Sequence, residues 1–263
     1  MDILTHTLSG LAVGTVAASF MKGTIGQRLV VLFFSALGGS VPDVDAISLW
    51  SGFDTTFGRW FGLDDPGKVI YSARFWHSHH GFMHSLTAAF CLAFLIGLCF
   101  SVIDKVIYRK DTSLFVDLKS RRFLLMGFAG GYIVHLLEDM LTPGGPWNGI
   151  RFLFPLNTYI GGTGEIWWWN NYDIFLIVLS VLVINLFLLF VLPSRLQVWR
   201  FTSFVLITSF LLVGIQVKSR GVDFNRGDYS VNEQESLQIQ QRILGDGVYK
   251  PMVRFDKSLK IYF

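Results

Sequence analysis

Residues 77–102 read HSHHGFMHSLTAAFCLAFLIGLCFSV, a histidine-rich polar segment that runs directly into a long apolar helix. Four of the six histidines in the protein lie between His77 and His84. Imidazole is the commonest neutral metal ligand. A cluster of histidines is unusual at the N-terminus of a hydrophobic helix. Alone, the segment is equally compatible with a solvated loop that binds metal only opportunistically. The other two histidines are paired with carboxylates at helix ends, and they favour a functional site.

The composition is that of an integral membrane protein. Of 263 residues, 52% are hydrophobic and 16% are charged, and the mean hydropathy is +0.48, whereas a soluble domain carries roughly 25% charged residues. The net charge of +3 is too small and too dispersed to indicate a nucleic-acid partner. We therefore expect the lipid bilayer as the main partner and no nucleic acid.

Hydrophobic runs predict an all-α bundle of about six transmembrane or membrane-embedded helices, which form a membrane domain over residues 1–217. Their approximate ranges are 8–21, 29–41, 85–103, 123–141, 173–192 and 201–217. The first two are shorter than the ~20 residues that cross a bilayer. Both are rich in small residues, which let helices approach closely in lipid. We expect them to form a tightly packed pair inside the bundle.

The segments outside these helices are more polar. Residues 218–263 form a small C-terminal tail, with a short amphipathic helix expected over 233–244 and strand-like alternation over 252–263. Trp167, Trp168 and Trp169 are consecutive in the loop before the fifth helix. They indicate an interfacial aromatic belt more strongly than a shelf for lipid or substrate.

Six spans bring every histidine and the candidate carboxylates to one membrane face. His135 and Asp139 are four residues apart, so their side chains share one side of a helix. An ionisable pair is expensive in lipid and is a functional candidate by default; the alternative is a hydrogen-bonded pair that ties helices together. Asp43 and Asp45 follow Pro42, where an Asx turn is the alternative reading.

The N-terminal histidine and the first histidine of the cluster have simpler alternatives. His6 lies near the start of the first helix, with Asp2 four residues before it, and is otherwise a helix-end histidine satisfied by the backbone. His77 is equally well explained as a loop residue.

Together these residues predict a metal centre of mixed nitrogen and oxygen ligands. The expected ligands are His6, Asp43, His84, His135 and Asp139. Such a set suits Zn, Mn, Fe or Ni better than a thiolate-type site does, and we expect a divalent transition metal, first of all zinc, as one or two ions. Asp45, His79 and Glu138 are candidates for positioning the ligands or for general acid–base catalysis.

The function that fits this centre is metal-dependent hydrolysis of an ester or phosphoester, in a lipid or another amphiphile. Two rival classes are a non-enzymatic membrane protein that binds or transports metal, and a purely structural protein that binds none. A transporter is expected to place its ligands near the bilayer midplane on discontinuous helices, whereas this chain places them at helix ends.

Four motifs occur in order along the chain: DILTHT at 2–7, PDVD at 42–45, HHGFMHSL at 79–86 and HLLEDMLTPG at 135–144, followed by FLFP at 152–155. Together they resemble the membrane-bound metal-dependent hydrolases of the YdjM type, named for a LexA-regulated bacterial inner-membrane protein. The resemblance covers roughly residues 1–192. It implies a hydrolase in the bacterial inner membrane, with a distant likeness to all-helical zinc phospholipase C folds.

The sequence departs from that family pattern at two positions. His80 stands where the family usually has arginine, and Met83 where it usually has threonine. If the arginine holds an anionic substrate, that role is either lost in this chain or taken by His80 when it is protonated.

The basic residues predict the orientation. The end of the bundle opposite the histidines collects ten Lys and Arg, and the loops on the histidine side collect four, namely Arg59, Lys68, Arg74 and Arg151. Because positive loops stay in the cytoplasm, the site is expected to face outward. The tail carries eight further Lys and Arg, but long segments count less under the same rule.

Overall fold

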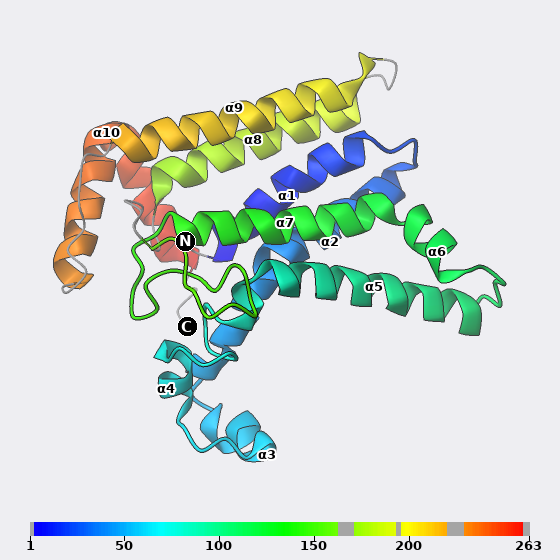
Figure 1. The fold of residues 1–263 in the computed structure, drawn as a ribbon. Coiled ribbons are helices and arrows are strands. Elements are labelled where there is room, and N and C mark those ends of the chain that lie inside the picture. Colours follow the sequence, from blue (N-terminus) through cyan, green and yellow to red (C-terminus); the bar gives the residue numbers. More distant parts are fainter. Residues whose placement is uncertain (1–2, 163–170, 193–195, 220–228, 260–263) are drawn as a thin grey trace.

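The fold comes from a computed structural model that describes residues 3–162, 171–192, 196–219 and 229–259 (Figure 1). Within these residues the chain is helical apart from loops and one isolated bridge between Ile150 and Ile160. The long helices are α1 (Ile3–Ser19), α2 (Ile25–Ser40), α5 (Leu86–Val106), α7 (Arg122–Met140), α8 (Tyr172–Val191), α9 (Val198–Ser219) and α10 (Tyr229–Leu259). The short elements are η1 (Val41–Leu49), η2 (Asp54–Gly58), α3 (Arg59–Phe61), α4 (Gly67–Ser72), η3 (Phe82–His84) and α6 (Leu114–Ser120).

Five apolar helical stretches in the described part of the chain are long enough to cross a membrane. They are Ile25–Leu49, which joins α2 to η1, and the helices α5, α7, α8 and α9. Helix α1, with 17 residues, is a shorter apolar helix. The predicted polytopic helical bundle is therefore confirmed. The first helix begins at Ile3 instead of residue 8, so His6 lies inside its first turn.

Helices α1, α2 and α7 pack against one another through glycines. A Cβ atom added to Gly10 of α1 would lie 2.5 Å from the carbonyl oxygen of Ser35 in α2. A Cβ atom added to Gly38 of α2 would lie 2.1 Å from the carbonyl oxygen of Phe128 in α7. Only residues without side chains allow backbones this close, which is how helices associate in lipid. The expected tight pairing of the first two helices is confirmed, and α7 joins them.

Helices α8 and α9 lie on one side of this central group and α5 lies on the other (Figure 1). Helix α8 packs on α1 and α9 packs on both, while α5 packs on α7 from the other side. Asn185 of α8 donates hydrogen bonds to the Thr15 hydroxyl of α1 and to the Thr202 carbonyl of α9. These polar contacts connect three helices in an otherwise apolar region, and such interhelical hydrogen bonds stabilise membrane bundles.

Residues 229–259 of the C-terminal tail are helical, and the strand expected over 252–263 is wrong for residues 252–259. Helix α10 runs from Tyr229 to Leu259 with a break at Gly245, whose φ is 66°. Its second half packs on α8, where the Tyr172 hydroxyl donates a hydrogen bond to Asp256. A strand needs a partner for its backbone, whereas a helix satisfies its own hydrogen bonds, and no strand is available nearby in the described chain. Residues 260–263 and the tryptophans 167–169 lie outside the described residues.

One end of the bundle carries all the elements in which the site was expected. Helix α1 begins there, α2 passes into η1 there, and η3 leads into α5. Ser85 caps α5: its hydroxyl oxygen accepts a hydrogen bond from the Ala88 N–H and donates one to the Phe82 carbonyl. This cap fixes the start of α5, and His84 directly precedes the cap residue Ser85. Helix α7 ends at the same place with His135 and Asp139 in its last turns.

Candidate metal centre

Four side chains from three elements meet at this end of the bundle. His84 Nε2 lies 3.4 Å from His135 Nε2 and 3.4 Å from Asp139 Oδ2. Asp43 Oδ1 of η1 lies 3.6 Å from each of those two nitrogens. His135 Nε2 and Asp139 Oδ2, one turn apart on α7, are separated by 3.0 Å. Ligands at 2.0–2.2 Å around a tetrahedral ion lie roughly 3.4 Å from one another. These five spacings are close to that value, and Asp43, His84 and His135 form one of the possible ligand groups.

One of the two histidine rings is fixed by a hydrogen bond on the side away from the four-atom cluster. His135 Nδ1 lies 2.8 Å from the Gly39 carbonyl oxygen and donates a hydrogen bond to it. A hydrogen bond to Nδ1 fixes the tautomer that leaves Nε2 free to bind a metal. His84 Nδ1 lies 3.3 Å from Asp45 Oδ2, and both atoms are buried without a hydrogen bond, so this contact is electrostatic.

His6 adds a third imidazole beside the same carboxylate. Its Nε2 lies 3.3 Å from Asp139 Oδ1, and its Nδ1 lies 2.6 Å from Glu138 Oε2. The Ser9 hydroxyl donates a hydrogen bond to the other oxygen of Glu138. The two oxygens of Asp139 thus face different histidines, Oδ1 facing His6 and Oδ2 facing the tetrahedral group. His6, His135 and Asp139 form a second possible ligand group.

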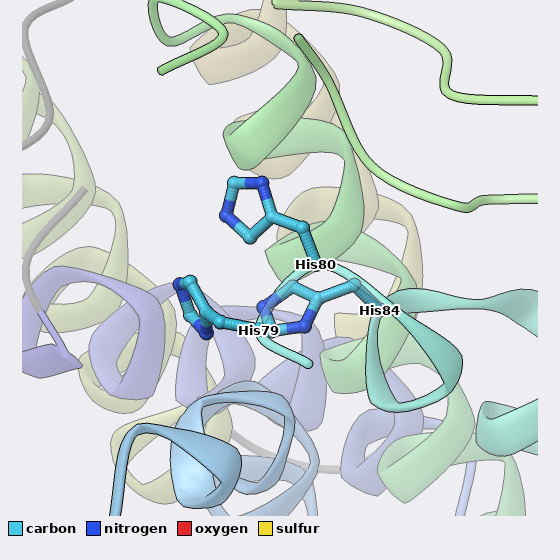
Figure 2. A group of neighbouring side chains, drawn as sticks. All are labelled: His79, His80 and His84. Carbon is cyan, nitrogen blue, oxygen red and sulfur yellow. The ribbon is translucent and has the colours of Figure 1, made fainter. Parts of the chain in front are cut away.

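Three histidines of the opening segment are gathered beside the centre, and Figure 2 shows His79, His80 and His84 around one small space. His79 Nδ1 lies 2.6 Å from Asp45 Oδ1, and its ring stacks on Tyr71 with centroids 4.6 Å apart. Asp45 therefore contacts His79 through one oxygen and faces His84 with the other. His77 is exposed and stacks on Phe75, outside this group.

His80 does not have the environment of a cationic residue. It is 5% exposed, and its Nδ1 lies 3.0 Å from the Gly149 carbonyl oxygen. Burial, followed by the neighbouring His79 and His84, holds the pKa of His80 well below its usual value. Burial thus disfavours the charged form of His80, and a role for this residue in place of the arginine of the family pattern stays a prediction.

The carboxylates dominate the electrostatics of the centre. Burial disfavours the charged form of His84, but Asp45, Asp43 and Asp139 outweigh it and raise its pKa to about 10. Burial and the same carboxylates raise the pKa of the Tyr71 hydroxyl. Both effects indicate a negative potential, which favours a bound cation.

Several residues that support the centre were not found from the sequence. Trp147 is buried against the rings of His79 and His80, and its Nε1 donates a hydrogen bond to the Tyr71 carbonyl. Ser9 stands one helical turn after His6, and that spacing is the one sequence signal that would have indicated it. The contacts of Trp147 join residues that are far apart in the chain, so they leave no comparable spacing pattern in the sequence.

Comparison with known proteins identifies the family. A family model described as the YdjM inner membrane protein matches residues 1–221. No curated protein and no solved structure gives a significant match. The match covers the membrane bundle and every residue of the candidate centre. The chain belongs to the YdjM family of inner membrane proteins and is an integral membrane protein.

Proposed function

We propose that this protein is a membrane-bound metal-dependent hydrolase whose ion is held by Asp43, His84, His135 and Asp139. The observation that carries the proposal is the set of 3.0–3.6 Å separations among their four ligand atoms. A hydrogen-bonded cluster without metal would not need two imidazole Nε2 atoms directed at each other. The placement of the centre at helix ends favours hydrolysis over transport, since transporters bind their ions near the midplane.

Zinc is the ion that fits best. Two imidazoles and two carboxylates in a tetrahedral arrangement are a set that zinc accepts, and among the described residues both cysteines are exposed on α5, away from the centre. His6 and Asp139 Oδ1 provide ligand atoms for a second ion. The chemistry that such an ion supplies is Lewis acidity, which lowers the pKa of water toward ~7 and polarises a carbonyl or phosphoryl oxygen.

The residues around the ligands would orient them and move protons. Glu138 holds His6, and the Gly39 carbonyl holds His135, so both rings keep their Nε2 atoms toward the centre. We assign proton transfer to the pair of Asp45 and His79. Their 2.6 Å contact keeps His79 in one orientation beside the centre, and a carboxylate–histidine pair is a common general base.

The substrate class follows from the position of the centre at the end of the bundle. We propose an ester or phosphoester carried by a lipid or another amphiphile. The test is a panel of carboxyl-ester and phosphoester amphiphiles, offered in lipid nanodiscs to the purified full-length protein. Turnover is expected to disappear after chelation and to return with zinc. If no substrate is cleaved and the protein instead moves zinc across a vesicle membrane in a manner that needs His84, the hydrolase proposal fails.

The orientation is part of the same proposal: the centre faces away from the cytoplasm. Residues 104–122, which run from the last turn of α5 to the start of α7, hold six of the ten basic residues at the opposite end of the bundle. Positive loops stay inside. A cytoplasm-active reporter inserted in residues 107–113 should be active, and the same reporter fused at Phe263 should be inactive. The opposite pair of results would reverse the assignment.

A further inference from the structure

Residues 44–76 form an arm that leaves the bundle at the end of α2, and Figure 1 shows α3 and α4 within it, projecting beyond the long helices. Its exposed surface is strongly aromatic. Trp60 is 76% exposed and Phe61 is 73% exposed. Other large apolar side chains exposed on the arm are Val44, Ile47, Trp50, Leu63, Val69, Phe75 and Trp76.

This surface suits the interface of the bilayer. The apolar stretch that contains α2 ends at Leu49, within the first residues of the arm, so the rest of the arm starts at the level of the membrane surface. Tryptophan and phenylalanine are favoured at that level. The arm carries four aspartates and three basic residues, a net charge of −1, so apolar contact and not attraction to anionic lipid would hold it there.

The arm contains an apolar cavity of about 240 Å³ whose wall includes Asp45. Phe53 and Ile70 are buried in its wall, while Phe61 and Leu63 are exposed to the outside. A pocket for a whole drug-sized molecule measures ~300–1,000 Å³, so this volume suits part of a hydrocarbon chain better than a headgroup.

Specific contacts hold the cavity open. The Gly67 N–H donates a 2.7 Å hydrogen bond to Asp54 Oδ1, which connects α4 to η2. A Cβ atom on Gly67 would lie 2.0 Å from the Ser48 carbonyl oxygen, so α4 lies directly against η1. On the other side, the hydrogen bond from Trp147 to the Tyr71 carbonyl ties α4 to the loop after α7. The pocket is therefore formed before any ligand arrives.

We propose that this cavity receives an acyl chain of a bilayer lipid and that the lipid is the substrate of the adjacent centre, an inference that rests on the proposed function. Asp45 makes the connection, because it lines the cavity and also contacts His79 and faces His84. A chain seated between Phe53 and Ile70 would hold the polar part of the lipid near Asp45. Burying methylene groups provides the affinity, at ~0.8 kcal/mol for each one.

The first test maps lipid contacts on the full-length wild-type protein. It is placed in phosphatidylcholine nanodiscs that contain a phosphatidylcholine with a photoreactive diazirine at one acyl terminus. Lipids around the bundle will label exposed residues of α8 and α9. A chain in the cavity is expected to label Phe53, Phe57 or Ile70, two of which are buried from the surrounding lipid. Labelling confined to exposed residues of the bundle and arm overturns the proposal.

A matched pair of variants gives the second test. Ile70→Trp fills the cavity, whereas Ile184→Trp places the same ring on the exposed surface of α8. In Ile70→Trp, labelling at Phe53 and Phe57 should fall about tenfold below the wild-type level, the loss expected when about two methylene groups are no longer buried. In Ile184→Trp, labelling at both residues should stay at the wild-type level. Equal labelling in both variants overturns the proposal. Retained metal content shows that each variant is folded.

These tests separate the cavity from the chemistry. If the cavity is labelled but the protein cleaves no ester or phosphoester, the lipid pocket is supported and the hydrolase proposal is rejected. If the protein does cleave amphiphiles, Ile70→Trp should lower turnover of long-chain substrates while turnover of short-chain esters is unchanged. If the cavity is not labelled and cleavage does not depend on chain length, the hydrolase proposal is supported and the lipid pocket is rejected.

Discussion

His84→Ala and His135→Ala are each expected to lose the tightly bound metal that the wild type retains through purification. The wild type should carry about one or two equivalents of a divalent transition metal, in line with mononuclear and dinuclear sites. Both rings place Nε2 within 3.6 Å of the same aspartate oxygens, and alanine removes one corner of the tetrahedral group. Changing even a residue behind a ligand costs ~10–100-fold in metal affinity, so loss of a ligand should cost more. Elemental analysis of the purified proteins measures the effect.

The control for this experiment is His77→Ala. His77 belongs to the same histidine-rich segment, but it is exposed and lies outside the four-residue group. It should keep the wild-type metal content. Equal loss of metal in all three variants would indicate opportunistic binding by the segment. Wild-type metal content in His84→Ala and His135→Ala would show that these residues do not bind the ion, and the proposed site would be rejected.

Asp45→Asn is expected to keep most of the metal when metal is supplied in excess and to lose turnover by ~10²–10⁴-fold, the usual contribution of a general acid–base residue. The amide oxygen can still accept the hydrogen bond from His79. It has no negative charge with which to stabilise a protonated ring, and it cannot accept a proton itself. Steady-state turnover and metal content are measured on the same preparation.

Asp64→Asn provides the comparison, because Asp64 is exposed on the arm and carries the same charge. It should behave as the wild type in both measurements. The turnover of Glu138→Gln is expected to lie between those of Asp45→Asn and Asp64→Asn, because Glu138 contacts His6 and not the four-atom group. If Asp45→Asn keeps full turnover, Asp45 only positions its neighbours and the proton must go elsewhere.

Much of the fold follows from hydrophobicity and from small residues. Long apolar runs have one outcome in lipid, because only a helix satisfies all its backbone hydrogen bonds there. The small residues of the first two apolar runs predict close packing, and Gly10 and Gly38 are the positions where the backbones meet. Helix α10 was less predictable, because the alternating pattern near Met252 fits a short strand as well as one face of a helix. The packing of this segment on α8 favours the helix.

The meeting of the candidate ligands was predictable for a different reason. The side of the membrane at which each helix begins and ends follows from counting spans, and it brings His6, Asp43, His84 and His135 to one face. The order within that group was not predictable. Asp43 faces the Nε2 atoms while Asp45 faces the Nδ1 of His84, a division set by the turn of η1.

X-ray absorption at the zinc edge of the purified, metal-containing protein tests the central claim most directly. Four nitrogen or oxygen neighbours at ~2.0–2.2 Å, with the outer-shell scattering of at least two imidazole rings, are predicted for an ion held by Asp43, His84, His135 and Asp139. The same imidazole scattering should be absent from residual zinc in His84→Ala. A spectrum dominated by sulfur at ~2.3 Å, or by water oxygens without imidazole, would contradict the account.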